Sequence, residues 1–373
     1  MNDAPLRVLH LTAGSDAGGV SRYLFNLCRA MHERGHDVCV AGQRGAWHHL
    51  FEGAAFPWLE VPLKGGWAAL RRSFAPLAEH VEAHRVDVVH AHYRKAALVA
   101  RRLARRLGVP LLFTLHVTGI PIHGVWRWFS DFGDHAHAPS LMARQWLIDQ
   151  GRVSADRITV IPHGIDPDAF PLSDAADQAR ARAALNVPAG AVVAAYVGRF
   201  DVPKNESWLI DLAAAGRTRV PPIHVLMLGE GPHEASLRAR VEAEGLEGRV
   251  RVLPYGDPLP VYQAADAVLL PSAQEGFSFV TTEAMSAGRP VLRTRTAGAA
   301  EHIVEGVTGR SVPVDRQMYL EAALAFLADR TALSAMGQAA AHHVRDHLTF
   351  ARQMADTLGL YRRLADQRAA RNQ

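Results

Sequence analysis

Short apolar runs alternate with longer amphipathic stretches along most of this chain of 373 residues. The runs have the length and the β-branched content of buried strands, and the stretches between them repeat apolar residues at helical spacing. The predicted strands are RVLHLTA, DVCVA, VDVVHAH, VPLLFTLH, ITVIP, AVVAAYVG, IHVLMLG, RVRVL, DAVLLPS and RPVLRT. Strands that alternate with helices in this way predict parallel sheets covered by helices.

Three of the predicted helices run into a glycine. VSRYLFNLCRAMHERG reaches Gly35, RKAALVARRLARRLG reaches Gly108, and LMARQWLIDQG reaches Gly151. Glycine adopts the left-handed conformation that closes many helices without steric cost. We therefore expect a left-handed cap at each of these positions.

The length favours two domains, because one domain usually holds roughly 150 residues. A segment rich in Asp, Ala, Pro and Arg, residues 166–190, interrupts the strand rhythm with one short helix, and from about Leu320 onward only helices are predicted. The predicted parts are an N-terminal Rossmann-like domain at 1–172, a linker at 173–190, a second domain at 191–350, and a C-terminal helix at 351–373 that returns to the first domain.

The composition excludes several classes of protein. Hydrophobic residues make up 49% of the chain and charged residues 21%, which are ordinary globular values and argue against disorder. No run approaches the roughly 18 apolar residues that span a bilayer, and the first residues do not resemble a signal peptide. We expect a cytoplasmic protein. Cys28 and Cys39 lie in apolar segments and are expected to be core residues, not a disulfide or a metal cluster.

Positive charge is concentrated in one segment. The whole chain carries 41 basic and 37 acidic residues, a net charge of +4, whereas residues 67–107 carry nine basic and three acidic side chains. Two interpretations stay open for this segment: a solvated outer helix, or peripheral contact with anionic lipid at the inner face of a membrane. A nucleic-acid-binding protein is less favoured, because the Arg-rich helix lacks aromatic platforms for bases.

Glycine-rich loops after predicted strands are candidate phosphate sites, because parallel sheets bind ligands beyond the carboxyl ends of their strands. The first loop, GSDAGGV, contains Gly14, Gly18 and Gly19, which allow close approach of the backbone to a ligand. It is not a GxGxxG fingerprint. The next strand is followed by Gly42–Arg44 and not by the acidic residue that would hold the ribose of NAD. A dinucleotide site is therefore poorly supported.

The loop VGRFDVPKN places Arg199 five positions before Lys204. An arginine fork and a mobile lysine ammonium can together neutralise one diphosphate. The plain alternative is a pair of solvated surface cations. Only three lysines occur in the chain, Lys64, Lys95 and Lys204, so a lysine directly after a strand-end glycine favours the phosphate site.

The loop PSAQEGFSFVTTEAMSAGRPV follows a buried strand and leads into a helix predicted to begin near Ser278. The backbone N–H groups of residues 277–280 would then form an anion site at the positive end of the helix. Glu275 in the loop and Glu283 in the second turn can both point toward a ligand. Alternatively, Glu275 is a solvated loop charge and Glu283 a carboxylate that the helix dipole favours.

Taken in order, seven segments resemble the family 4 retaining glycosyltransferases of the GT-B architecture over roughly residues 6–310. The segments are GSDAGGV, TLH, VIPHGID, VGRF with Lys204, LGEGP, PSAQEGFSFVTTEAMSAGRPV and AGAAEHIVEGVTG. The most specific of them is the pair of glutamates separated by seven residues, with EGF at its start. The resemblance implies an α/β fold of two Rossmann-like, doubly wound parallel-sheet domains that face each other across a cleft.

The resemblance also implies roles for individual residues. Glu283 would hold the donor ribose, and Glu275 would lie near the sugar hydroxyls. His116, at the end of VPLLFTLH, would lie near the transferred sugar; its alternative is a hydrogen-bonded histidine at a strand end. The implied catalytic residues are His116, Glu275, Arg199 and Lys204. The implied donor-binding residues are Gly18, Gly19, Gly198, Arg199, Lys204, Tyr255, Gly276, Phe277, Ser278, Phe279, Val280 and Glu283.

Three positions depart from the commoner family pattern: PKN lacks a glycine after the lysine, EGFSF replaces EGFG, and His163 stands where asparagine is usual. None of these changes removes a charge that a phosphate needs. We therefore expect a metal-independent enzyme without a cofactor, which moves a hexose-type sugar from a UDP- or GDP-linked donor to a hydroxyl acceptor bound by the N-terminal domain. The alternative is a GT-B protein that isomerises or only binds a nucleotide sugar.

Overall fold

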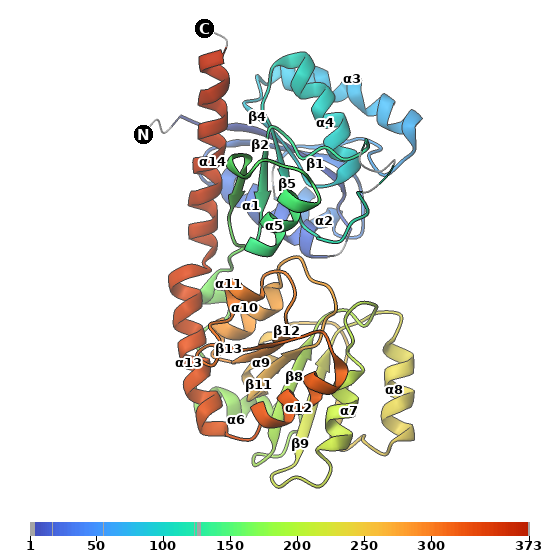
Figure 1. The fold of residues 1–373 in the computed structure, drawn as a ribbon, viewed down its shortest axis with the longest axis vertical. Helices are drawn as coiled ribbons and strands as arrows, with labels where there is room; N and C mark the ends of the chain where they lie inside the picture. Colours follow the sequence, from blue (N-terminus) through green and yellow to red (C-terminus); the bar gives the residue numbers. More distant parts are fainter. Residues whose placement is uncertain (1–3, 17, 55, 123, 125–127, 372–373) are drawn as a thin grey trace. The chain divides into compact units, whose positions relative to one another are not determined.

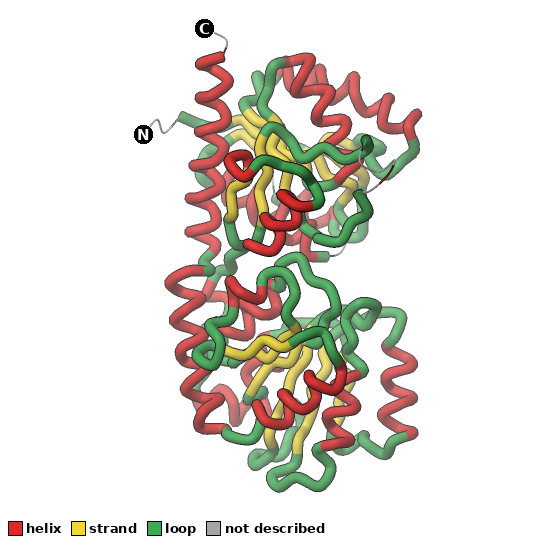
Figure 2. Tube along the Cα trace, in the orientation of Figure 1, coloured by secondary structure: helices red, strands yellow, loops and turns green. Residues whose placement is uncertain are grey.

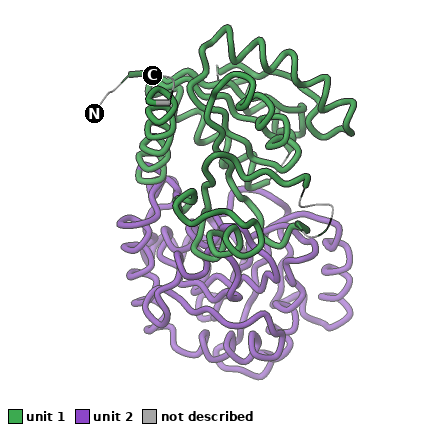
Figure 3. Tube along the Cα trace, turned by 45° about the horizontal axis from the view of Figure 1, so that its top comes forward, with its two compact units in different colours: residues 1–163, 352–373 green, residues 164–351 purple. Residues whose placement is uncertain are grey.

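The computed structural model describes residues 4–16, 18–54, 56–122, 124 and 128–371. The chain forms two compact units, coloured separately in Figure 3. Unit 1 contains Met1–His163 and Arg352–Gln373, and unit 2 contains Gly164–Ala351. Each unit is a parallel sheet with helices packed around it (Figures 1 and 2), so the predicted α/β class is confirmed.

Unit 1 has a seven-stranded sheet in the order β3-β2-β1-β4-β5-β6-β7. Its strands are β1 (Arg7–Gly14), β2 (Asp37–Gln43), β3 (Trp58–Glu60), β4 (Val88–Ala91), β5 (Leu111–Thr114), β6 (His135–Ala138) and β7 (Ile158–Val160). All neighbouring strands are parallel. The strand order reverses direction between β1 and β4, which makes their carboxyl ends a topological switch point.

Helices cover both faces of this sheet, and every residue of β4 and β5 is buried. The helices are α1 (Gly19–Glu33), α2 (His48–Glu52), α3 (Trp67–Ala83), α4 (Arg94–Leu107) and α5 (Leu141–Asp149). The last helix, α14 (Phe350–Arg371), begins in unit 2 and belongs to unit 1 from Arg352. Its Tyr361 hydroxyl lies 2.7 Å from Nδ1 of His90, and its Arg368 donates to the carbonyl of Val86.

Unit 2 has a six-stranded parallel sheet in the order β10-β9-β8-β11-β12-β13. Its strands are β8 (Val192–Val197), β9 (Ile223–Leu228), β10 (Val250–Leu253), β11 (Ala267–Leu270), β12 (Val291–Thr294) and β13 (Gly309–Val312). Its helices are α6 (Ala175–Ala184), α7 (Trp208–Ala215), α8 (Glu234–Ala243), α9 (Leu259–Ala264), α10 (Phe279–Ser286), α11 (Ala299–His302), α12 (Arg316–Phe326) and α13 (Arg330–His347). The switch point of this sheet lies between β8 and β11.

The ten strands predicted from sequence are all present, and three further strands were not predicted. β3 has only three residues, and β13 reads GRSV, which has no apolar alternation. β6 reads HAHA, and three of its four residues are buried. Its histidines are polar, so the sequence lacks the apolar pattern of a buried strand. These strands form because they pair with a neighbouring strand, and not because their residues have a high local strand propensity.

Two of the three predicted glycine caps are confirmed and one is wrong. Gly35 and Gly108 have φ angles of 79° and 62°, in the left-handed region. After α5 that conformation falls on Arg152, with φ of 55°, and not on Gly151. Gly151 instead allows a close approach, because a Cβ there would lie 2.6 Å from the carbonyl oxygen of Leu147.

The two cysteines are buried and unpaired, which confirms that they are core residues. Burial raises the pKa of the Cys28 thiol well above its ordinary value, so this side chain is an uncharged thiol. Every helix in the described part of the chain is too short or too polar to span a bilayer.

Candidate active site

Two loops meet at the switch point of the sheet in unit 2. One follows β8 and contains Arg199 and Lys204, and the other follows β11 and contains Glu275. They are tied together because the amide of Asn205 donates to the carbonyl of Pro271 over 2.9 Å, and the Ala273 N–H donates to the carbonyl of Pro203 over 2.7 Å. Residues 71 positions apart in the sequence therefore share one site.

Lys204 and Glu275 form an ion pair at this point. The lysine Nζ donates to Oε1 of the carboxylate over 2.7 Å, and the two side chains are only 21% and 14% exposed. Burial by itself would raise the pKa of the Glu275 carboxyl, but the charge and hydrogen bond of Lys204 outweigh burial and hold that pKa below its ordinary value. The Glu275 carboxylate is therefore ionised at neutral pH.

Arg199 stands at the other end of the same loop. Its guanidinium pairs with Asp201 over 2.9 Å, and its side chain remains 65% exposed. The backbone beneath it is fixed, since the Tyr196 hydroxyl donates to the carbonyl of Arg199 over 2.8 Å. The two predicted cations thus lie on one loop, and each is paired with its own carboxylate.

Close backbone approach shapes this loop. A Cβ on Gly229, after β9, would lie 1.9 Å from the carbonyl oxygen of Gly198, so no larger residue fits there. Gly198 itself has φ of 155°, a conformation that favours glycine. The glycines bring the ends of β8 and β9 close together and hold the loop over the sheet edge.

The helix α10 begins where the sequence predicts it. Ser278 is the N-cap, and its hydroxyl accepts a hydrogen bond from the Thr281 N–H over 3.2 Å. Glu283 lies in the second turn and is 1% exposed, with the Tyr262 hydroxyl donating to its Oε2 over 2.8 Å. The positive end of the helix and a buried carboxylate therefore adjoin the loop that carries Glu275.

Arg293 is a residue of this region that the sequence analysis missed. It is 1% exposed, and its guanidinium donates to Nδ1 of His302 over 2.9 Å and to Oγ1 of Thr296 over 2.9 Å. Its positive charge also contributes to the lowered pKa of Glu275. The sequence did contain a signal for this residue: burying an arginine in the apolar strand VLRT costs free energy unless its charge is paired or hydrogen-bonded.

His302 receives that bond in a defined tautomer. Burial lowers its pKa well below the ordinary value, so the ring is neutral, and its Nδ1 can only accept from Arg293. The proton therefore lies on Nε2, which donates to Oγ1 of Thr282 in α10 over 2.9 Å. The chain Arg293–His302–Thr282 anchors the first turn of α10.

In unit 1, His116 lies two residues beyond β5 and is half-buried. Its Nε2 lies 3.0 Å from Nδ1 of His92, and its ring is 5.1 Å from that of Tyr23. Burial, with a smaller contribution from the charge of His137, lowers the pKa of His116 to about 3. His116 is therefore a neutral, hydrogen-bonded imidazole.

His116 belongs to a cluster that the sequence analysis did not predict. Pairwise contacts between rings link the six histidines of this cluster around the switch point of unit 1. They are His10, His90, His92, His116, His137 and His163. The motif HAH occurs twice, at 90–92 and 135–137, and HAHA forms β6. Alternate residues of a strand share a face. The repeated HAH motif was therefore the feature of the sequence from which the histidine cluster could have been predicted.

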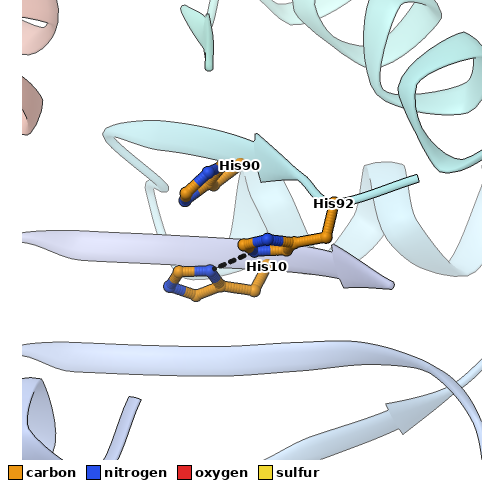
Figure 4. Close-up of side chains that lie close together, drawn as sticks. All are labelled: His10, His90 and His92. Carbon is orange, nitrogen blue, oxygen red and sulfur yellow. Dashed lines mark hydrogen bonds between the residues drawn. The ribbon is translucent and has the colours of Figure 1, made fainter. Parts of the chain in front are cut away.

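Three of these histidines have the composition of a metal site (Figure 4). One ring nitrogen each of His10, His90 and His92 lies within 4.8 Å of the others. However, both nitrogens of His90 are hydrogen-bonded, to Tyr361 and Thr114, and Nδ1 of His10 lies 3.0 Å from Nε2 of His92. A metal ion would have to break these bonds, so the residues fit a hydrogen-bonded network better than a metal centre.

The remaining predicted donor-binding residues are dispersed. Gly18 is the N-cap of α1 and Gly19 its first residue, both in unit 1. In unit 2, Tyr255 follows β10 and is 64% exposed, and Gly276 is half-buried beside Glu275. Hydrogen bonds and ion pairs of unit 2 connect Lys204 with Glu275, and Glu283 with Tyr262.

Both halves of the chain match models of glycosyltransferase families. Residues 17–169 match the model of Glycosyltransferase Family 4, and residues 191–329 match that of Glycosyl transferases group 1. The D-inositol 3-phosphate glycosyltransferase of Nocardia farcinica is 30% identical over 369 residues, which cover 88% of this chain and 81% of the relative. That of Actinosynnema mirum is 30% identical over 79% of this chain and 80% of the relative.

Solved structures share the fold across the chain. The Anabaena protein HepE, in complex with UDP and glucose, has a TM-score of 0.79 at 24% identity and covers 95% of this chain and 99% of its own. A glycosyltransferase from Rickettsia africae has a TM-score of 0.82 at 18% identity, with 96% and 98% covered.

Proposed function

The chain belongs to the family 4 glycosyltransferases, a family of GT-B enzymes, and we propose that it transfers a hexose from a UDP-linked donor to a hydroxyl acceptor with retention of the anomeric configuration. Unit 2 binds the donor and unit 1 the acceptor. The observation that carries the proposal is the Lys204–Glu275 pair at the switch point of unit 2. The complex of HepE with UDP and glucose supports the choice of UDP over GDP.

The donor site works by charge. When the bond from the sugar to the diphosphate breaks, negative charge develops on the leaving oxygens. Lys204 and Arg199 stabilise that charge directly, and the start of α10 adds its dipole. These groups supply the positive potential from the chain itself, so we propose that the transfer needs no metal ion.

Glu275 has two tasks in this proposal. It orients Lys204 before the donor arrives, through the 2.7 Å bond. With the donor present, its second oxygen accepts a hydrogen bond from a sugar hydroxyl. Glu283, held by Tyr262, accepts from the ribose. We also propose that His116 contacts the transferred sugar.

Incubation with a panel of UDP-, GDP- and ADP-sugars tests this function. Mass spectrometry of nucleotide release, with and without acceptors that include an inositol phosphate, separates transfer from hydrolysis and isomerisation. We expect UDP release that depends on the acceptor and persists in EDTA. Isomerised donor without any transfer product would establish the alternative function, and an α-linked donor that yields a β-linked product would exclude retention.

We also propose peripheral contact of residues 67–107 with anionic membrane lipid. Trp67 is 60% exposed and lines a surface cavity with Arg71 and Arg72 at the start of α3. An amphipathic aromatic ring beside arginines suits the lipid headgroup region. Not all the basic residues contribute, because Arg101 is paired with Asp131 and Asp134.

Vesicle flotation tests this contact. The wild-type protein should float with vesicles that contain phosphatidylglycerol and not with phosphatidylcholine alone, and 0.5 M salt should weaken binding. Arg71→Glu/Arg72→Glu should abolish flotation. Arg180→Glu/Arg238→Glu, with the same charge change on exposed arginines of unit 2, should not. Equal flotation of both double variants would contradict the assigned surface.

A further inference from the structure

Two chains of hydrogen bonds run through the histidine cluster of unit 1, and the first is closed at both ends. The Tyr361 hydroxyl lies 2.7 Å from Nδ1 of His90, and Nε2 of His90 lies 2.6 Å from Oγ1 of Thr114. Thr114 then lies 2.9 Å from Nδ1 of His137, whose Nε2 lies 2.8 Å from the carbonyl oxygen of Ile161.

The carbonyl fixes every proton of this first chain. A carbonyl oxygen only accepts, so His137 carries its proton on Nε2 and accepts at Nδ1 from the Thr114 hydroxyl. Thr114 then accepts from Nε2–H of His90, which accepts at Nδ1 from Tyr361. Every polar hydrogen is used inside the protein. This chain is structural and presents nothing to a ligand.

The second chain has a different end. Nδ1 of His10 lies 3.0 Å from Nε2 of His92, as the dashed line in Figure 4 shows, and Nδ1 of His92 lies 3.0 Å from Nε2 of His116. A neutral imidazole carries one proton. Both bonds can therefore form in only two ways, with the protons pointing either all toward His116 or all toward His10.

The buried end of the chain decides between them. His10 is fully buried, and its Nε2 has no hydrogen-bond partner in the described part of the chain. If the protons pointed toward His10, that Nε2 would carry a buried N–H without an acceptor. If they point toward His116, it is only an unused lone pair. Buried N–H groups without an acceptor are the rarer case in proteins.

We propose that His92 is a positioning residue that holds His116 in the tautomer with its proton on Nδ1, so that His116 presents an N–H donor to an oxygen of the transferred sugar. His116 is half-buried, and its hydrogen bond within the described chain is made by Nε2. The contact with the sugar rests on the proposed function, whereas the tautomer does not.

This assignment limits what His116 does. Nε2 is occupied by the N–H of His92, and Nδ1 already carries a proton, so the ring cannot take the proton of the acceptor hydroxyl. Burial also lowers the pKa of His116 to about 3, in agreement with a neutral ring. His116 therefore orients the sugar by hydrogen bonding and is not the general base.

Nuclear magnetic resonance reads the tautomer without any reaction. In the full chain labelled with ¹⁵N-histidine, long-range ¹H–¹⁵N spectra at pH 7.5 distinguish protonated from bare ring nitrogens, and His116→Asn identifies the His116 signals. We expect Nδ1 protonated and Nε2 bare in the wild-type protein. Protonated Nε2 on His116 would overturn the proposal, and this measurement needs no variant of His92.

Variants of His92 test the cause. His92→Asn keeps an N–H near the position of Nδ1 and should preserve the His116 pattern, whereas His92→Leu should spread the proton over both nitrogens. His36→Gln is the control: it alters another buried histidine of unit 1, which accepts from the Leu6 N–H, and should leave His116 unchanged. An unchanged His116 pattern in His92→Leu would overturn the role of His92.

Activity tests the sugar contact separately. His92→Leu should lower kcat/KM on the order of 10- to 100-fold, by analogy with the loss of a hydrogen-bond partner that orients a metal-binding histidine. His116→Asn, which keeps a donor near Nδ1, should retain more activity than His116→Leu. If His116→Leu were fully active while the wild-type spectrum showed Nδ1–H, the sugar contact would fail and the tautomer assignment would stand.

Discussion

The two switch points of this protein are built from the same strand arrangement and opposite chemistry. In unit 1, six histidines surround the ends of β1 and β4, and burial keeps rings such as His10 and His116 neutral. In unit 2, the loops after β8 and β11 hold a full ion pair, with the buried Arg293 beside it. A parallel sheet therefore fixes where a ligand binds, and the side chains fix which ligand chemistry suits it.

The contrast matches the two parts of a nucleotide sugar. The diphosphate carries charge and needs fixed cations, which unit 2 provides. The sugar is uncharged and is bound by directed hydrogen bonds, which neutral imidazoles provide. Four experiments test this contrast.

Acid should unfold unit 1 before unit 2. The pKa values of His10 and His116 are lowered to about 3 and that of His137 to about 4, and burial also lowers those of His90 and His92. A histidine held neutral in the folded state binds a proton only on unfolding. Its contribution to stability is therefore complete above pH 6.5 and is lost below it, at up to about 1.4 kcal/mol per pH unit for each histidine.

Hydrogen exchange at pH 7.5, 6.0 and 5.0, corrected for intrinsic rates, checks this prediction. Peptides of β1, β4 and β5 should lose protection well before those of β8 and β11, whose site contains one buried neutral histidine, His302. Equal loss in both units would show that the histidine cluster does not govern the acid response.

Thr114→Val should destabilise unit 1 by about 2–6 kcal/mol. The nearly isosteric valine leaves the His90 N–H and the His137 Nδ1 buried without partners, at about 1–3 kcal/mol for each group. Urea unfolding measures the loss. Thr159→Val removes a comparable bond to the half-buried His135, which water can replace, and should cost less than about 1 kcal/mol.

Lys204→Ala should lower kcat about 100- to 1,000-fold, or about 2.7–4 kcal/mol in transition-state stabilisation, because the leaving diphosphate loses a half-buried cation. Steady-state kinetics with the donor found in the panel measures the effect. Arg238→Ala removes an exposed cation that pairs with Glu234 on α8 and should leave turnover unchanged. A fully active Lys204→Ala would refute the donor site.

Glu275→Gln should separate product binding from turnover. Removing a carboxylate 2.7 Å from Nζ of Lys204 frees the lysine charge for the diphosphate, so UDP should bind about 1 kcal/mol more tightly. Turnover should fall, because the sugar loses a hydrogen-bond acceptor. Calorimetry and kinetics on the same preparation measure both quantities. Weaker UDP binding would contradict this expectation and would mean that orienting Lys204 matters more for the diphosphate than the negative charge of Glu275 does.

Local features of the site were predictable from the sequence. The predicted start of α10 at Ser278 is confirmed because N-capping is a local rule, and the buried strands before both loops of unit 2 have clear apolar patterns. The scarcity of lysine singled out Lys204, whose role in the donor site stays a prediction. The histidine cluster was not predicted, because each histidine is ordinary in its own segment and the rings meet only across four strands.

The periodic elements, the turns that need glycine and the residues available for chemistry can be predicted from the amino-acid sequence, because these depend on neighbours a few positions away. Which of these residues meet depends on the folded arrangement of the strands and helices. Strand order brings Lys204 to Glu275 across 71 positions and places Tyr361 of the last helix on His90 across 271. The protonation states follow from these contacts, since a pKa depends on burial and on charges that distant segments supply.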